Sequence, residues 1–130
     1  MAYAEDAADG IAILLWAARP EQPELLHTPF FFAAAAAAME TPVEMYFTAQ
    51  SVRLLQKGVA EQLQAPGHTK NVLQAMQEAA SFGVRFLACT DALRAAGLQA
   101  SDLVDLCQGH GGAVQFMARA ADLRWRTLVF

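Results

Sequence analysis

Runs of apolar residues alternate along the chain with segments in which apolar residues recur every three or four positions. Three of the runs have the length of a strand, namely Gly10–Ala18, Val43–Phe47 and Val84–Ala88. The first is apolar throughout, which is typical of a strand buried on both faces of a parallel sheet. In the second, Glu44 and Tyr46 alternate with three apolar residues. A fourth run, residues 125–130, predicts a terminal strand.

The segments between these runs predict helices. Thr28-Pro29 is a helix start signal, because threonine caps a helix N-terminus and proline fits the first helical position. Gly83 and Gly97 end two later helices, as a glycine that follows the last turn commonly does. The expected helices are Pro29–Met39, Thr48–Lys57, Thr69–Phe82, Thr90–Ala96, Ser101–Leu106 and Ala113–Asp122.

The C-terminal segments and the order of the elements complete the predicted fold. The glycine-rich segment Cys107–Gly112 is expected to be a flexible loop, and Val104–Cys107 just before it is a candidate short strand. The last helix is expected to turn Val114, Met117, Ala118 and Ala121 inward. Strands that alternate with helices predict an α/β fold with a mostly parallel sheet of about five strands.

The predicted helix Pro29–Met39 is apolar almost all round, since it contains three phenylalanines and six alanines. Such a helix is normally covered on more than one side. In a chain of 130 residues the expected cover is a second subunit.

Composition narrows the class of protein. With 130 residues and 55% hydrophobic residues, we expect a single domain over residues 1–130, with residues 1–9 as a loosely ordered N-terminus. A net charge of −4 without a Lys/Arg cluster argues against nucleic-acid binding. The longest apolar run, residues 30–39, is too short to span a membrane. We therefore expect a cytoplasmic protein whose two cysteines are free.

Cys89 is the strongest candidate for chemistry. It follows a buried strand and precedes a short helix, so it is expected at the carboxyl edge of the sheet, where ligands of parallel sheets bind. Unpaired N–H groups and the positive end of the helix dipole favour a thiolate there. Asp91 in the same turn opposes that effect. The alternative is a small buried residue with a structural role.

Cys107 and His110 form a second candidate site. The surrounding glycines let backbone approach a ligand closely, and a histidine near a cysteine can act as its base or ion-pair partner. The alternative is a surface loop with an incidental cysteine. Together with Cys89 these residues lack a close ligand pair, so we expect no metal site. His27 and His68 are expected to be solvated.

Several segments, taken in order, resemble the DsrE/DsrF-like family of small sulfur-relay proteins over about Gly10–Phe130. The resemblance is carried by Ala35–Ala38, by Val43–Thr48 with Val52–Gly58, by Gly83–Cys89 with Ala92, Leu93 and Gly97, and by Gly111–Asp122 closing on Leu128–Phe130. It implies a three-layer α/β/α sandwich and homo- or hetero-oligomers such as trimers and hexamers. In several members the cysteine after the third strand carries a persulfide, a role that falls here on Cys89.

This resemblance leads to the expected function. The chain is expected to be a sulfurtransferase-like carrier with Cys89 as catalytic residue, and with Thr90, Asp91, Cys107 and His110 as candidate substrate-binding residues. Its partners are sulfur donor and acceptor proteins and further copies of itself, and no cofactor is required. Thr90-Asp91 is more polar than the family pattern, and Cys107 and His110 match no family position.

Two other interpretations stay open. Some family members lack the cysteine, so the chain is alternatively a non-catalytic scaffold or small-molecule-binding protein. A third interpretation is a redox sensor with a Cys89–Cys107 disulfide, which needs Cα atoms within about 7 Å of each other.

Overall fold

A computed structural model describes residues 8–130 of the chain. Most of the predicted loosely ordered segment, residues 1–9, therefore lies outside the described residues. Asp9, at the start of the described part, is held by Arg124: its backbone N–H donates to the Arg124 carbonyl oxygen, and its carboxylate pairs with the guanidinium.

Five strands form one sheet with the order β4-β3-β2-β1-β5, and every neighbouring pair is parallel. The strands are β1 (Gly10–Leu15), β2 (Val43–Phe47), β3 (Arg85–Ala88), β4 (Cys107–His110) and β5 (Trp125–Val129). β2 is the central strand, and β1 lies between β2 and the edge strand β5. The predicted α/β class with a five-stranded parallel sheet is confirmed.

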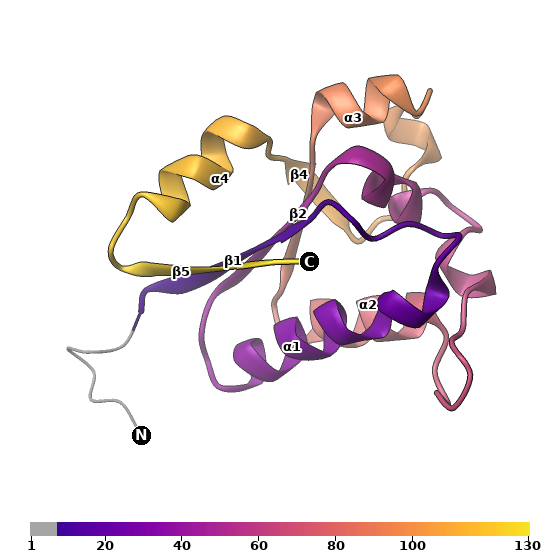
Figure 1. The fold of residues 1–130 in the computed structure, drawn as a ribbon, viewed down its shortest axis with the longest axis horizontal. Helices are drawn as coiled ribbons and strands as arrows, with labels where there is room; N and C mark the ends of the chain where they lie inside the picture. The colour runs from indigo at the N-terminus through magenta and orange to yellow at the C-terminus, as the bar shows by residue number, and fades with distance from the viewer. Residues whose placement is uncertain (1–7) are drawn as a thin grey trace.

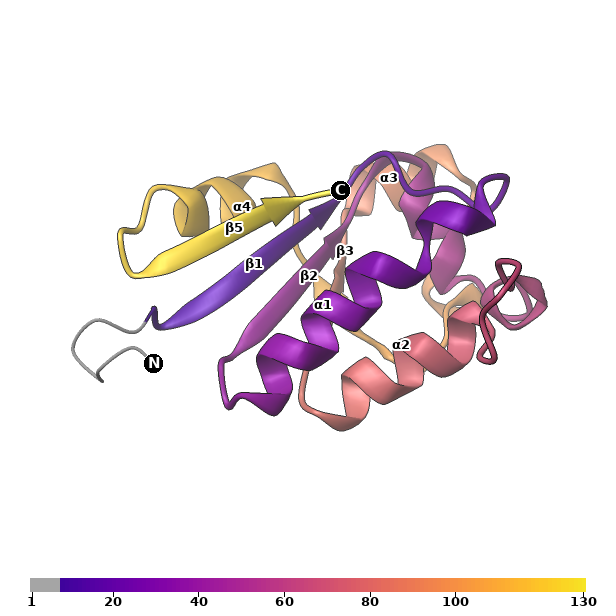
Figure 2. The same ribbon diagram turned by 60° about the horizontal axis from the view of Figure 1, so that its bottom comes forward.

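Helices cover both faces of the sheet, as Figures 1 and 2 show. α1 (His27–Ala38) and α2 (Val72–Ser81) lie side by side on one face, and α4 (Ala113–Ala120) lies on the other. α3 (Thr90–Ala95) stands beyond the carboxyl end of β3. Short 3-10 helices complete the chain, namely η2 (Pro23–Leu25), η3 (Ala49–Leu55), η4 (Ala60–Gln62) and η5 (Ala100–Asp102). The three-layer arrangement is as the family resemblance implies.

The two faces of the sheet carry cores of very different size. The larger core lies under α1 and α2, where Phe30, Phe47 and Phe86 pack with ring centroids 5.4–6.2 Å apart. The smaller core, under α4, consists of Ala12, Tyr46, Leu87 and Phe116. The α4 layer therefore rests on few apolar contacts.

Several element boundaries differ from the prediction. α1 begins at His27 rather than Pro29, so Thr28 does not cap it. α2 begins later, at Val72, because the Asn71 side chain caps it by accepting the Gln74 N–H at 2.8 Å. The predicted helices at 48–57 and 101–106 are the 3-10 helices η3 and η5.

The predicted flexible loop Cys107–Gly112 was wrong over most of its length. Residues Cys107–His110 form β4, which pairs with β3 through a register shift between Phe86 and Leu87. Glycine-rich segments have low strand propensity, but the open edge of β3 supplies hydrogen-bonding partners that outweigh it. Of the other candidate strand, Val104–Cys107, only the last residue, Cys107, belongs to β4.

The predicted inward face of the last helix was also wrong. Val114 is 88% exposed and Met117 is 59% exposed, and Ala118 and Ala121 are exposed as well. Phe116 is the buried residue of α4. The helix turns Phe116 and Arg119 toward the sheet, because Arg119 is hydrogen-bonded to the carboxylate of Glu44 there.

His27 is buried rather than solvated, because the first turn of α1 packs under the segment that precedes α2. Its Nε2 lies 2.9 Å from the Lys70 carbonyl oxygen, and its ring stacks on His68 at 4.0 Å. No helix among residues 8–130 has both the length and the apolar character that crossing a membrane requires.

Candidate functional site

Cys89 stands between β3 and α3, where the sequence predicts it. Its N–H donates to the Phe47 carbonyl oxygen at 2.9 Å, and its carbonyl oxygen accepts the Leu93 N–H at 3.0 Å. The first bond continues the β2–β3 ladder, and the second begins α3, for which Cys89 is the N-cap. The backbone of the cysteine is therefore fixed on both sides.

Strand alternation turns the Cys89 side chain toward the α4 face. Phe86 and Ala88 point into the larger core, whereas Leu87 belongs to the smaller core and Cys89 follows it on the same face. There the cysteine is partly exposed and lines a cavity of about 260 Å³. The other lining residues, none of them charged, are Leu14, Tyr46, Thr48, Gly111, Gly112, Ala113, Phe116 and Met117.

Two glycines bring the β4–α4 connection close to the thiol. A Cβ at Gly111 would lie 2.9 Å from the Tyr46 ring and 3.1 Å from the Leu87 side chain, so only glycine fits there. The Gly111 N–H donates to the Ala88 carbonyl oxygen at 3.0 Å, immediately before Cys89. A Cβ at Gly112 would lie 3.8 Å from the Cys89 Sγ. Gly112 thus leaves open space beside the sulfur.

A buried carboxylate joins the sheet to α4, which forms one wall of the cavity. Glu44 of β2 accepts a hydrogen bond from the Tyr46 hydroxyl at 2.7 Å. It also accepts two from Arg119 of α4, at 2.9 and 3.0 Å. The Arg119 guanidinium lies 4.0 Å from the ring centroid of Trp125, and Arg85 stands 3.7 Å from the carboxylate.

The surroundings of Glu44 determine its ionisation. Burial by itself would raise the pKa of Glu44, but the hydrogen bonds from Arg119 and Tyr46 and the two guanidinium charges outweigh it and lower the pKa. Burial and the hydrogen bond to Glu44 raise the pKa of Tyr46 to about 12. Glu44 is therefore ionised and Tyr46 is a hydrogen-bond donor at neutral pH.

Thr90 and Asp91 lie beside Cys89 in the chain but do not line its cavity. Both are exposed, and the Asp91 carboxylate accepts a hydrogen bond from Arg94 at 2.9 Å. Because this pair faces solvent, water screens the negative charge that the sequence places near the thiol.

Cys107 and His110 are brought together with each other but not with Cys89. They line a separate cavity of about 330 Å³ along β4. Cys107 packs against the larger core, on the opposite face of the sheet from Cys89, and burial raises the pKa of its thiol. Both cysteines are free. Within residues 8–130 no group of three or more His, Cys, Asp or Glu side chains is placed to hold a metal ion.

Sequence reasoning missed the residues that shape the cavity. Tyr46, Phe116 and Gly112 surround the thiol, and Glu44 and Arg119 hold the wall. One signal was present: Glu44 lies between the apolar residues Val43 and Met45 of a predicted strand, and a carboxylate inside a sheet requires a cation as partner.

One comparison with known proteins identifies a family. The model of the DsrE/DsrF-like family matches residues 12–130. No curated protein matches the chain by sequence.

Solved structures share the fold at low identity. The ychN protein of E. coli is 19% identical, with a TM-score of 0.69 over 93% of this chain and 99% of its own. Protein MTH1491 of Methanobacterium thermoautotrophicum is 19% identical, with a TM-score of 0.65 over 92% and 97%. Protein BT1422 of Bacteroides thetaiotaomicron is 17% identical, with a TM-score of 0.67 over 94% and 95%.

The Glu44 contacts predict a pH-dependent contribution to stability. Glu44→Gln should lower the free energy of unfolding by about 1–3 kcal/mol near neutral pH, because Arg119 loses its charged acceptor. Since the folded pKa lies below the ordinary value of 4.5, this contribution is present above 4.5 and is lost as the pH falls through the folded pKa. Urea unfolding of both proteins across this range measures it.

The matched control is Asp91→Asn, which removes the carboxylate of an exposed arginine pair. Its effect should stay below about 1 kcal/mol at every pH. Equal effects of the two substitutions, or a Glu44→Gln effect that grows in acid, would contradict the assignment.

Proposed function

Because the chain belongs to the DsrE/DsrF-like family, we propose that it is a sulfur carrier of the sulfurtransferase type, with a persulfide held on Cys89. The observation that carries the proposal is the position of this thiol. It is partly exposed in an apolar cavity at the carboxyl edge of a parallel sheet, with its backbone fixed by Phe47 and Leu93. A thiol with only a packing role would be sealed in the core.

The proposed chemistry is two thiol exchanges. In the first, the Cys89 thiolate attacks the outer sulfur of a donor persulfide, R–S–S–H. A new S–S bond forms to Cys89, the donor S–S bond breaks, and its electron pair leaves with the donor as R–S⁻. In the second, an acceptor thiolate attacks the outer sulfur of Cys89–S–S–H, and Cys89 leaves as thiolate. The relay as a whole needs no external oxidant, reductant or cofactor.

The lining of the cavity supports protein thiols as partners. Small anionic sulfur donors are bound in proteins by arginine, lysine or clustered N–H groups, whereas no arginine or lysine is among the nine lining residues. A cysteine carried on a partner chain brings its own binding surface and needs only access to the Cys89 sulfur. In this proposal the exposed Thr90 and Asp91 contact the partner chain, and Cys107 and His110 take no part in the relay.

We further propose that the protein acts as a homo-oligomer in the cytoplasm. Two free thiols suit a reducing compartment. Val114 and Met117 form an exposed apolar stripe on α4, and Phe32 of α1 and Met39, the residue after α1, are also exposed. The α4 stripe, rather than the α1 face expected from the sequence, is the favoured contact, because Met117 also lines the Cys89 cavity and a second subunit there would extend its wall beside the opening that a partner thiol uses.

The relay predicts a persulfide on one cysteine. After incubation with a protein persulfide donor, mass spectrometry of peptides should show one added sulfur on Cys89, and Cys89→Ser should lose the adduct and the transfer. Cys107→Ser is the matched control and should keep both. If Cys89 stays unmodified with every donor, the proposal is wrong. If a Cys89–Cys107 disulfide forms under a mild oxidant, the redox-sensor interpretation is favoured instead.

The space beside the sulfur predicts a steric effect. Gly112 has extended backbone angles that any residue adopts, so Gly112→Val fills the space next to Cys89 Sγ without backbone strain. We expect persulfide loading to slow by about tenfold or more, the equivalent of about 1.4 kcal/mol. Thermal unfolding should change little. Unchanged loading at unchanged stability would show that the sulfur is approached from elsewhere.

The oligomer predicts a change in mass upon substitution of α4. The wild-type protein should sediment well above the 14.0 kDa of one chain, and Val114→Glu should return it to that mass, because a charge buried in an apolar interface is costly. Met39→Glu, at the end of α1, is the control and should leave the assembly intact. Dissociation by Met39→Glu alone would place the contact on α1.

A further inference from the structure

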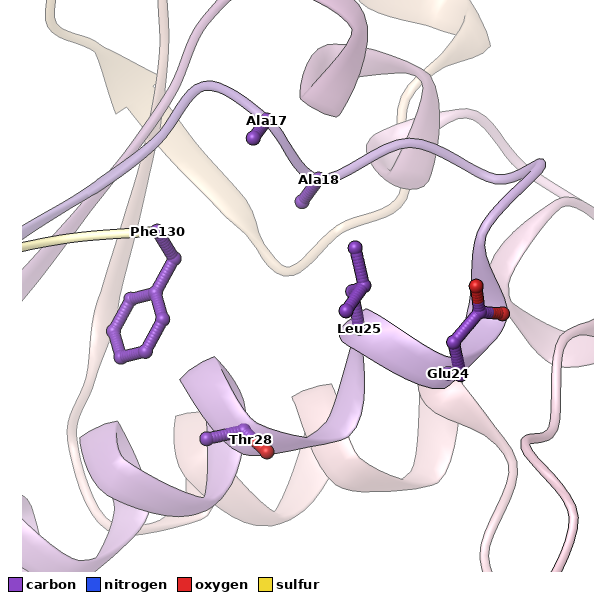
Figure 3. Close-up of a pocket in the computed structure, with 6 residues that line it drawn as sticks. All are labelled: Ala17, Ala18, Glu24, Leu25, Thr28 and Phe130. Carbon is purple, nitrogen blue, oxygen red and sulfur yellow. The ribbon is translucent and has the colours of Figure 1, made fainter.

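A third cavity lies at the carboxyl edge of the sheet, on the α1 face and away from Cys89. Its volume is about 300 Å³. Figure 3 shows the residues that line it, Ala17, Ala18, Glu24, Leu25, Thr28 and Phe130. None of them lines the Cys89 cavity.

The strand order of the sheet reverses at the position of this cavity. From β1 the chain adds β2, β3 and β4 in one direction, and then returns to place β5 on the other side of β1. The crossover through α1 lies on one face and the crossover through α4 on the other, so the order reverses between β1 and β5. In open α/β sheets the crevice beyond the strand ends at such a reversal is the usual place for a ligand.

The cavity stands directly beyond those two strand ends. Ala17 and Ala18 follow β1, and Phe130 follows β5. The Phe130 carbonyl oxygen accepts the N–H groups of Trp16 and Ala17 at 2.9 and 3.2 Å. These bonds hold the two strand ends together and fix the floor of the cavity before any ligand arrives.

The lining is apolar at one end and acidic at the other. In Figure 3 the Phe130 ring lies at one end, Glu24 at the opposite end, and Leu25 and Thr28 between them. Glu24 carries the only charge among the six lining side chains. Among the described residues it makes no ion pair or side-chain hydrogen bond, whereas the nearby Glu21 is bound by Arg53 at 2.7 Å.

We propose that this cavity binds a compact organic amine. Its apolar body lies between the Phe130 ring, Leu25 and the two alanines, and its ammonium group reaches the Glu24 carboxylate, with the Thr28 hydroxyl as an additional acceptor. An anionic ligand would meet the Glu24 charge in a chain of net charge −4, and a neutral one would leave the carboxylate unused. The site is independent of the Cys89 relay.

The test is a titration of the full chain with phenethylamine, followed by ¹H–¹⁵N NMR. Saturable shifts are expected at the amides of Ala17 and Ala18. Glu24→Gln should weaken binding by about three- to fivefold, the range of an exposed ion pair. Ala17→Phe, at an exposed position, should fill the cavity and abolish binding. Glu21→Gln, the neighbouring acid that does not line the cavity, should bind as wild type does.

Two further ligands and one further variant make the test decisive. 3-Phenylpropionate and 2-phenylethanol, which replace the ammonium with a carboxylate and a hydroxyl, should bind more weakly than phenethylamine. Cys89→Ser should bind it normally, which separates this site from the relay. Absence of shifts at Ala17 and Ala18, equal binding of either analogue, or an unchanged affinity in Glu24→Gln would overturn the proposal.

Discussion

The buried carboxylate of Glu44 orients the third layer of this protein, α4, on the sheet. The large core under α1 and α2 needs no polar partner, but α4 contributes a single buried apolar residue, Phe116, to the opposite face. The bidentate pair between Arg119 and Glu44 supplies what apolar contact does not, since it fixes both the position and the rotation of the helix. A charge placed inside the sheet thus orients the wall of the Cys89 cavity.

The same contact explains why the apolar stripe of α4 faces outward. α4 can turn only one of two sides to the sheet. One side carries Val114 and Met117, and the other carries Phe116 and Arg119. If the stripe faced inward, Glu44 would lose both Arg119 hydrogen bonds and keep only the more distant Arg85, and a poorly compensated buried charge costs more than exposing Val114 and Met117. The exposed stripe is therefore a consequence of satisfying Glu44, and it leaves the rim of the cavity apolar.

Local pattern was sufficient to predict much of the fold. The apolar runs at β1, β2 and β3, and the thiol between β3 and α3, follow from strand and helix periodicity alone. β4 did not, because Cys107–His110 becomes a strand only through pairing with β3. The inward face of α4 and the burial of His27 were missed for the same reason. Each depends on a partner distant in sequence, Glu44 in one case and Lys70 in the other.

In the candidate site, too, the part that depends on local sequence was predictable and the part that depends on distant residues was not. Cys89 was identifiable because its position depends on neighbouring residues, whereas the cavity around it draws on β1, β2, the β4–α4 connection and α4. Thr90 and Asp91 were chosen for proximity along the chain, and a helix turns such neighbours away from one another. Cys107 was separated from Cys89 by strand alternation, which no count of cysteines reveals.

The register shift between β3 and β4 makes the position of the following chain depend on the number of residues in β4. Phe86 faces Cys107, but Leu87 faces Gly109, so Gln108 is an extra residue in the ladder. Removing it would leave Gly109 opposite Leu87 but would make the ladder regular, and the local bend that an extra residue produces just before Gly111 and Gly112 would be lost. Insertions and deletions are ordinarily tolerated at exposed turns such as Pro66–Gly67. The number of residues in β4 therefore helps to set where Gly112 lies beside the Cys89 sulfur.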